Sequence, residues 1–584
     1  MQDPHSFARP QEACITHLEL DLELDFEQKI IRGQVLLHIE NRTATEVLVL
    51  DTQGLSIGAV FQEEEEVVPR LMPDVTPLGQ ALHIPIRPDT RRVKIFYETA
   101  PQAEALQWLE PHQTEGGQHP FLFTQSQAIL ARSWIPCQDG PGMRFTYSAR
   151  IKVPPGLMAL MSAENPARIS PSGLYSFEMP QPIPAYLLAL AVGRLEFAPI
   201  SEQVGVYAEP NSLDAARQEF EEVPAMLMAA AQLYGSYAWG RYDLLVLPPS
   251  FPFGGMENPR ITFTTPTIIA GDRSLTSLIA HELAHSWSGN LVTNATWNDF
   301  WLNEGFTVYF ERRIMEALYG PEYAEMLAFL GYQDLQNTLA ELLPHRSHDT
   351  HLKLALKGRN PDEGVNDIAY EKGFFLIKCL EAHVGRPALD EFLKQYFADH
   401  AFAAMDTEQF IRYLVQKLPA AVSLNLEEWI YQPGLPANCP VPQAKRFLAV
   451  QAQQTAWLNA EIDLKELQVK HWTSHEWLYW IRGLPPTLRP AQIESLDQAF
   501  GFTQSGNAEI LCAWLTWALP QHYAPALEAV SQFLQKVGRR KFLRPLYRAL
   551  LTHYPEQARA IYQKARSGYH FVSVHTLDKM LAWE

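Results

Sequence analysis

Hydrophobic and polar residues alternate with a period of two over the first third of the chain. From Ile15 onward, leucines at every second position and Phe26 share one face, while acidic residues fill the other. This alternation is typical of a strand with one buried face. Similar short runs, separated by Pro, Gly and Asn, recur at 34–40, 46–50, 93–97 and 144–153. Residues 1–195 are therefore predicted to form an antiparallel β-sheet domain.

The pattern changes to a helical period beyond Arg194. Apolar residues recur every three to four positions over 212–237, 371–384 and 388–400, which is typical of amphipathic helices. We therefore predict a mainly α-helical domain over residues 196–436.

A proline-rich break from Pro433 to Pro440 predicts a linker. Helical periodicity returns after it, without strand alternation, over 508–519, 524–537, 544–552 and 555–565. Residues 437–584 are thus expected to form a C-terminal α-helical domain of stacked hairpins. The fold class that follows is a multidomain α+β protein.

Length and charge limit the class of protein. A chain of 584 residues exceeds what one core usually supports, so several domains are expected. A formal net charge of −19 without a long Lys/Arg run argues against binding nucleic acid. No apolar stretch suits a membrane span or a leader peptide, so we expect a cytoplasmic protein without a membrane partner. Five scattered cysteines favour reduced thiols, and the absence of heptads favours a monomer.

The most informative motif is His281-Glu282-Leu283-Ala284-His285. Two histidines four apart project from one helix face, so both imidazoles can bind one metal ion, with Glu282 beside them as a general base. The alternative is a buried helix whose histidines hydrogen-bond to neighbours. Glu304 is the candidate third ligand, and Glu311, seven residues later, can orient an imidazole or form an ordinary pair with Arg312 or Arg313.

Capping signals suggest the bounds of these two helices. Asp272-Arg273-Ser274 predicts the start of the first helix, and Gly289-Asn290 predicts its stop. Asn298 or Asp299 is expected to cap a second helix over 300–318.

These residues resemble the M1 zinc aminopeptidases. The histidine motif is followed, after eighteen intervening residues, by the Glu of Trp-Leu-Asn-Glu-Gly, and it is preceded by Gly254-Gly255-Met256-Glu257-Asn258. The runs 245–258 and 287–301 are most similar to the leukotriene A4 hydrolase/aminopeptidase branch. The resemblance implies one Zn²⁺ per chain, a thermolysin-like catalytic domain and a HEAT- or armadillo-like C-terminal domain.

The resemblance also assigns roles to individual residues. Tyr370, in Tyr-Glu-Lys-Gly, would stabilise an oxyanion. Glu257, with Gln127 and its neighbour Gln125, would bind the substrate's ammonium group. Gly254, Gly255 and Met256 would lie along the substrate, although a plain turn is the alternative for the glycines.

Two further assignments concern the substrate's far end and pocket. Asp362 either lines the pocket or lies in a solvated turn. Arg539 and Lys541, in a basic Gly-Arg-Arg-Lys-Phe-Leu-Arg-Pro cluster, would hold a C-terminal carboxylate and so favour tripeptides. Val365 stands where the branch's mammalian hydrolases carry tyrosine, which bears on epoxide chemistry rather than on peptide hydrolysis.

The leading hypothesis is a zinc aminopeptidase that acts on short peptides. The first alternative is hydrolysis of a lipid epoxide such as leukotriene A4, alone or as a second activity. The second is a peptide-binding scaffold with a degenerate zinc site, which the intact residues of the motif argue against. His345, His348 and His351 are interpreted as a surface loop rather than a second metal site.

Overall fold

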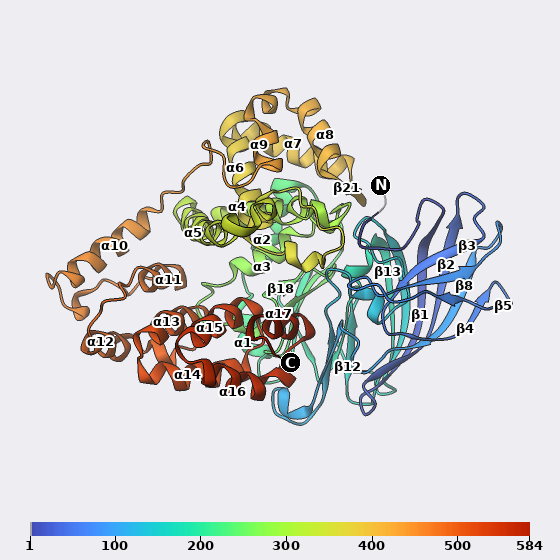
Figure 1. Ribbon diagram of the computed structural model, residues 1–584, viewed down its shortest axis with the longest axis horizontal. Helices are drawn as coiled ribbons and strands as arrows, with labels where there is room; N and C mark the ends of the chain where they lie inside the picture. The colour runs from blue at the N-terminus through green and yellow to red at the C-terminus, as the bar shows by residue number, and fades with distance from the viewer. Residues whose placement is uncertain (1–2, 584) are drawn as a thin grey trace.

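The computed structural model describes residues 3–583. Three bodies follow one another along the chain (Figure 1): a β-rich body, drawn blue to cyan, a central helical body around a small sheet, and an orange-to-red helical body at the C-terminal end. The predicted multidomain α+β fold is confirmed. The boundaries at residues 195 and 436 remain predictions.

The N-terminal body contains three sheets. The seven-stranded sheet, in the order β13-β11-β1-β2-β8-β4-β5, comprises β1 (Ala13–Asp25), β2 (Ile30–Asn41), β4 (Ser56–Gln62), β5 (Glu65–Val67), β8 (Arg92–Glu98), β11 (Phe145–Lys152) and β13 (Leu174–Ile183). The two smaller sheets are formed by β3 (Val47–Thr52), β6 (Arg70–Leu71) and β7 (Gln80–Pro85), and by β9 (Leu106–Leu109), β10 (Phe121–Thr124), β12 (Met158–Met161) and β14 (Leu190–Gly193).

Strand β1 follows the predicted alternation. Leu18, Leu20, Leu22 and Leu24 are buried, and the acidic side chains between them are exposed. The prediction of a wholly antiparallel sheet is wrong at one place, because β1 pairs with β11 in parallel. The chain returns to β1 only after forming the intervening strands, and such a long connection allows the same direction.

The central body contains a sheet that the periodicity did not reveal. Its strands, in the order β15-β16-β17-β19-β18, are β15 (Glu196–Pro199), β16 (Val204–Ala208), β17 (Tyr242–Val246), β18 (Gly255–Met256) and β19 (Ile261–Thr264). Strands β16, β17 and β19 are parallel and buried along their whole length. A strand buried on both faces shows no alternation, which explains why it was missed. A second, two-stranded sheet pairs β20 (Val292–Asn294) with β21 (Ala403–Met405).

Helices form the rest of the central body. They are α1 (Leu213–Glu219), α2 (Val223–Tyr234), α3 (Ser277–Ala284), α4 (Trp301–Tyr319), α5 (Pro321–Arg346), α6 (Gly373–Val384), α7 (Arg386–Asp399), α8 (Thr407–Lys417) and α9 (Leu426–Tyr431). The segment 212–237, predicted as one helix, is two, because Pro224 starts a new helix in its first turn. A π-helical turn, η8 (Ile368–Lys372), precedes α6.

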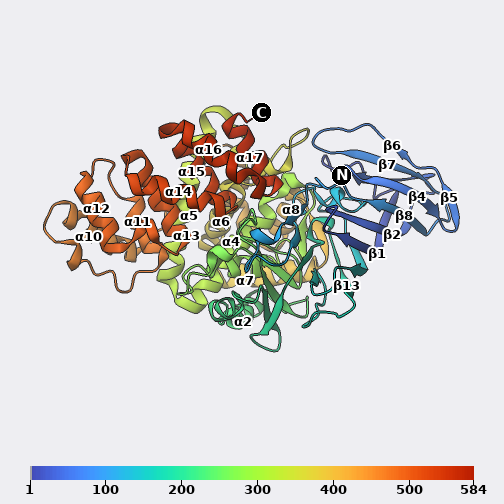
Figure 2. The same ribbon diagram turned by 90° about the horizontal axis from the view of Figure 1, so that it is seen from below.

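The C-terminal body is entirely helical and has its own core (Figure 2). Its helices are α10 (Lys445–Leu458), α11 (Ser474–Arg482), α12 (Pro490–Phe500), α13 (Ala508–Ala518), α14 (Ala524–Lys536), α15 (Arg540–His553), α16 (Pro555–Ala565) and α17 (Phe571–Leu581). Helix α15 begins four residues before the predicted 544, so the basic cluster occupies its first turn. Within residues 3–583, no helix has the length and apolarity to cross a bilayer. All five cysteines are free thiols.

Candidate metal centre and active site

Helices α3 and α4 pack together and carry the histidine motif and Glu304. His281 lies in the last turn of α3. His285 follows the last helical residue, but its backbone keeps helical angles and its N–H donates to the carbonyl of His281. The two rings therefore share a face, as the four-residue spacing predicts.

The predicted helix bounds need correction. Helix α3 begins at Ser277, after Thr276, because Asp272 binds the backbone and hydroxyl of Ser274 within the preceding loop. Helix α3 ends at Ala284, five residues before the predicted stop at Gly289. Helix α4 begins at Trp301 without a side-chain cap.

Asp299 is not a cap because its carboxylate is used elsewhere. It accepts hydrogen bonds from the backbone and hydroxyl of Thr407 and from the hydroxyl of Thr296. It therefore ties the start of α4 to α8.

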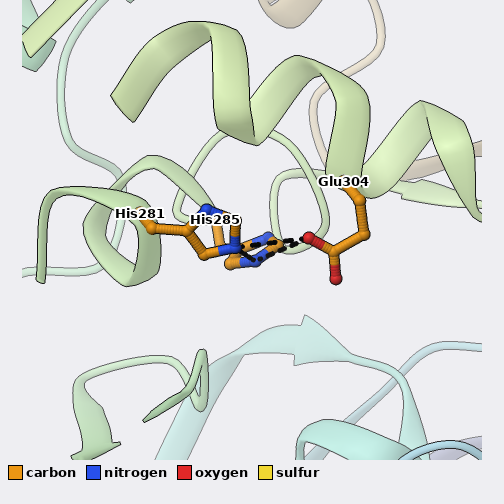
Figure 3. A group of neighbouring side chains, drawn as sticks. All are labelled: His281, His285 and Glu304. Carbon is orange, nitrogen blue, oxygen red and sulfur yellow. Dashed lines mark hydrogen bonds and ion pairs between the residues drawn. The ribbon is translucent and has the colours of Figure 1, made fainter. Parts of the chain in front are cut away.

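Three ligand atoms converge between α3 and α4 (Figure 3). The Nε2 atoms of His281 and His285 lie 3.2 Å apart. The Oε2 atom of Glu304 lies 3.3 Å from the former and 3.5 Å from the latter. In tetrahedral zinc sites, bonds of about 2.0–2.2 Å place neighbouring ligand atoms roughly 3.3–3.6 Å apart. The spacing of this trio thus fits a zinc ion.

Hydrogen bonds on the far side of each imidazole ring orient its Nε2 atom toward the common point. His285 Nδ1 lies 3.0 Å from the carbonyl of Ser288, and His281 Nδ1 lies 3.1 Å from a carboxylate oxygen of Glu311. Both Nδ1 atoms therefore donate, which leaves the Nε2 lone pairs facing each other and Glu304. Glu304 Oε2 is buried and receives no hydrogen bond from the described residues. Two imidazole nitrogens and a carboxylate oxygen that face one buried point form a suitable set of ligands for a metal cation.

Glu311 contacts the His281 imidazole, which confirms the prediction that it orients a metal-binding histidine. The alternative of a surface pair with Arg312 or Arg313 is wrong, since Arg312 binds Glu371 and Arg313 binds Asp390. A carboxylate behind a ligating histidine fixes the ring and raises its basicity. Burial opposes protonation of His281, but Glu304 and Glu311 raise its pKa well above the ordinary value.

His345, His348 and His351 form no metal group. The only clusters of potential ligands within residues 3–583 are the trio and a group of Glu257, Glu282 and His285. His345 and His348 are exposed, as the prediction of a surface loop requires, but the prediction of a loop is wrong: His345 lies in the last turn of α5 and His348 in a 3₁₀-helical turn that follows it.

The Gly254–Glu257 segment lies against the motif helix. A Cβ atom on Gly255 would lie 2.4 Å from the carboxyl carbon of Glu282, so only glycine fits beside that side chain. A Cβ on Gly254 would lie 2.8 Å from Nη2 of Arg539. Both glycines thus lie in close contact with neighbouring side chains, which favours the first of their two interpretations, close approach, over a plain turn.

Two buried carboxylates flank the metal trio. Burial raises the pKa of Glu282 to about 8, although the His281 imidazole opposes the shift. Burial, and then the charges of Glu282 and Glu304, raise the pKa of Glu257 well above its ordinary value. Glu257 Oε1 has no hydrogen-bond donor among the described residues. An unpaired carboxylate of this kind is suited to a cationic ligand.

Tyr370 lies in the π-helical turn η8 and reaches the same site. Its ring stacks on that of His281, with centroids 6.0 Å apart. Burial, and then the carboxylate of Glu304, raise the pKa of Tyr370 well above the ordinary value. The phenol therefore keeps its proton and can donate a hydrogen bond.

The structure places the remaining predicted residues around this centre. Gln125 is fully buried, and its Nε2 donates to the sulfur of Met256 at 3.2 Å. Gln127 is half-buried two residues further on. Asp362 accepts a hydrogen bond from the backbone of Ala128, so it lies beside the glutamine segment rather than in a freely solvated turn.

Arg539 and Lys541 differ in burial but share one carboxylate partner. The Arg539 side chain is 6% exposed and its Nη1 donates to the hydroxyl of Thr267 at 3.2 Å, whereas Lys541 is 56% exposed. Both contact the carboxylate of Glu509 on α13. Sequence reasoning missed Glu509 and Thr267, because neither lies in a motif and only the fold brings them to Arg539.

Three family models match the chain. The peptidase M1 N-terminal domain matches residues 15–187, the peptidase family M1 domain matches 218–429, and the leukotriene A4 hydrolase C-terminal domain matches 472–581. Together they cover most of the chain.

Two relatives resemble the whole chain. A leukotriene A-4 hydrolase from Xenopus laevis is 37% identical over 100% of this chain and 99% of its own length. A leucine aminopeptidase 2 from Pyricularia oryzae is 36% identical over 97% of this chain and 96% of its own length.

Solved structures agree with these relatives. Yeast LTA4 hydrolase in complex with bestatin has a TM-score of 0.92 and 33% identity, covering 100% of this chain and 97% of that one. An M1 zinc metallopeptidase from Deinococcus radiodurans, 24% identical, shares the fold over 76% of this chain with a TM-score of 0.61. The predicted family is confirmed: the chain belongs to peptidase family M1 and is a zinc metallopeptidase of the leukotriene A4 hydrolase type.

Proposed function

We propose that this protein is an aminopeptidase that releases the N-terminal residue from short peptides, above all tripeptides. The supporting observation is the set of charged groups that contact the segment 254–257. Glu257 has a carboxylate oxygen without a hydrogen-bond donor among the described residues and lies with Glu282 and His285, and Arg539 lies against Gly254 at the start of the segment. A peptide with free ends carries the matching charges.

Zinc, when bound by His281, His285 and Glu304, polarises a carbonyl group and lowers the pKa of water. The chain's own residues perform the proton transfers. Glu282 accepts a proton from the attacking water and passes it to the leaving amine. The Tyr370 hydroxyl donates a hydrogen bond to the carbonyl oxygen as it gains negative charge.

Recognition of the free amine makes the enzyme an exopeptidase. Glu257 binds the substrate ammonium group, with Gln127 and Gln125 at the same end of the cleft. The extended backbone lies along Gly254, Gly255 and Met256. Because the ammonium group is held close to the catalytic groups, only the first peptide bond reaches them.

Recognition of the far carboxylate limits substrate length. Arg539 and Lys541 lie on the C-terminal body and bind the carboxylate, while Asp362 lines the pocket beside the glutamine segment. A substrate held at both ends must have a fixed number of residues, which favours tripeptides.

The test is a panel of tripeptides compared by kcat/KM. N-acetylation is expected to abolish cleavage because it removes the charge that Glu257 binds. C-terminal amidation is expected to lower kcat/KM at least tenfold, mainly through KM. An aminoacyl anilide, which has no carboxylate, is the control, and Arg539→Ala should leave its turnover nearly unchanged. Equal losses on the anilide and the tripeptide would contradict the carboxylate site.

Epoxide hydrolysis is the second candidate, because the Xenopus relative is named leukotriene A-4 hydrolase. Val365 provides no hydroxyl at the position where the mammalian hydrolases carry tyrosine. We therefore expect peptide cleavage to dominate. This expectation is checked by incubating the enzyme with leukotriene A4 and analysing the products. If the epoxide is turned over faster than tripeptides, epoxide hydrolysis is the main activity instead.

A further inference from the structure

Glu509 lies between the two basic residues of the proposed carboxylate site. It occupies the first turn of α13, which packs against α15 (Figure 2). Its Oε1 accepts from Lys541 Nζ at 2.7 Å and from Arg539 Nη1 at 3.4 Å. Its side chain is 11% exposed. One buried carboxylate thus serves two cations.

These contacts occupy one edge of the Arg539 guanidinium. Nη1 binds Glu509 and the hydroxyl of Thr267. On the other edge, Nε is buried without an acceptor in the described part of the chain, and Nη2 lies against Gly254. A guanidinium edge with two free N–H groups is the geometry that binds a carboxylate in a bidentate manner.

The negative charge of Glu509 also affects which substrates the carboxylate site accepts. Arg539 and Lys541 carry two positive charges and Glu509 one negative charge, so the three groups together carry +1. A substrate with a single terminal carboxylate neutralises this charge. A second carboxylate placed next to Glu509 would face a like charge whose two contacting cations are already engaged, and like charges a few ångströms apart near a protein surface repel strongly.

We propose that Glu509 is a positioning and specificity-determining residue: it holds Arg539 with its free edge toward Gly254 and discriminates against peptides with a second carboxylate at the C-terminal end. This inference rests on the proposed carboxylate site at Arg539 and Lys541. Glu509 acts through these two side chains and does not touch the reacting atoms.

The first test needs only the wild-type enzyme. Ala-Ala-Asp and Ala-Ala-Asn differ by one charge and almost nothing in shape. We expect kcat/KM to be about tenfold lower for the Asp peptide at low salt, and the difference to shrink as salt screens the repulsion. Equal cleavage of the two peptides at low salt would overturn the proposal.

Two variants separate charge from position. Glu509→Gln keeps an oxygen that accepts from Lys541 and Arg539 but removes the charge, so the Asp/Asn ratio of kcat/KM should rise to within twofold of one. Glu509→Ala removes the anchor as well, so KM for Ala-Ala-Asn should rise about tenfold. The matched control is Glu528→Gln, which removes one exposed charge from α14 in the same body. Turnover of the aminoacyl anilide at the wild-type rate shows that each variant is folded.

The outcomes distinguish this inference from the proposed function. If amidation slows tripeptide cleavage but Glu509→Gln leaves the Asp/Asn ratio unchanged, the role of Glu509 is refuted and the carboxylate site stands. If amidation has no effect on the wild-type enzyme, the carboxylate site itself is refuted, and the role of Glu509 with it.

Discussion

At the scale of single residues, the centre is defined by the hydrogen bonds that orient its two imidazole rings. Ser288 and Glu311 take the Nδ1 protons of the two imidazoles, so both Nε2 lone pairs face Glu304. The histidine spacing predicts this convergence because both residues lie within one helical turn. The partners behind the rings are not local in sequence, and only Glu311 was anticipated.

Glu282→Gln is the residue-scale prediction. The amide cannot accept the proton of the attacking water, so kcat should fall by about 10²–10⁴-fold. Because Glu282 is not one of the three converging ligands, the variant should retain about one equivalent of zinc, measured by atomic absorption. Glu322→Gln, an exposed change on α5, is the control. Loss of zinc from Glu282→Gln would assign that residue to metal binding instead.

At the scale of elements, the C-terminal body is joined to the loop before β18 by backbone contacts. The N–H groups of Gly538 and Arg540 donate to the carbonyls of Pro249 and Pro252, both at 2.8 Å. A Cβ on Gly538 would lie 2.5 Å from the carbonyl oxygen of Ser250. This contact sets where Arg539 stands relative to Gly254.

Gly538→Ala tests that contact. The new methyl group forces the two segments apart, so Arg539 should shift and kcat/KM for tripeptides should fall about tenfold or more. Turnover of the aminoacyl anilide should change less, because it does not use Arg539. Gly506→Ala, where a Cβ meets nothing within 4 Å, is the matched control. Equal activity of the two variants on tripeptides would show that the contact does not set the position of Arg539.

Lys372 links the turn that carries Tyr370 to the segment after α9. It is fully buried, and its Nζ donates to the carbonyls of Thr350 and Gln432 at 2.8 and 3.0 Å. Burial lowers the pKa of Lys372 to about 7. No carboxylate contacts it among the described residues, so its charge is not compensated.

This predicts a pH dependence of stability. The unfolded chain binds a proton at Lys372 up to a pH of about 10.4, whereas the folded protein releases it above about 7. Between these values the unfolded state binds more protons, so this residue adds stability as pH rises. The melting temperature of the wild type relative to Lys372→Met should therefore be higher at pH 9 than at pH 6.5. A difference independent of pH would show that Lys372 stays charged in the fold.

At the scale of the whole molecule, the proposed function draws on all three bodies. In that proposal the N-terminal body supplies Gln125 and Gln127, the central body supplies the metal ligands and Glu257, and the C-terminal body supplies Arg539. The three ligand atoms of the metal centre lie within 3.5 Å of one another between α3 and α4. The monomeric state and the cytoplasmic location remain predictions.

Removal of zinc is the prediction at this scale. Chelation should abolish turnover and lower the melting temperature by several degrees, since the folded state binds zinc through ligands that the unfolded chain does not hold together. One equivalent of zinc should restore both, as measured by calorimetry and anilide cleavage. Activity that survives complete removal of zinc would contradict the proposed chemistry.

Local patterns in the sequence determined the metal ligands, the N-terminal strands and the C-terminal helices. A motif within one helical turn and a period of two or 3.6 residues are properties of neighbouring residues, so they can be read without the fold. The central parallel sheet was not readable, because strands buried on both faces lose their alternation.

Only the tertiary structure decided which distant groups meet. Glu509 on α13 reaches Arg539 through packing within the C-terminal body, while Thr267 after β19 and the carbonyl of Ser250 reach the same segment through packing between two bodies. No local pattern in the sequence specifies such contacts. The start of α4 at Trp301 was also decided by long-range bonds, since Asp299 binds Thr407 instead of capping α4. Burial and hydrogen bonding across the fold outweighed the local capping preference.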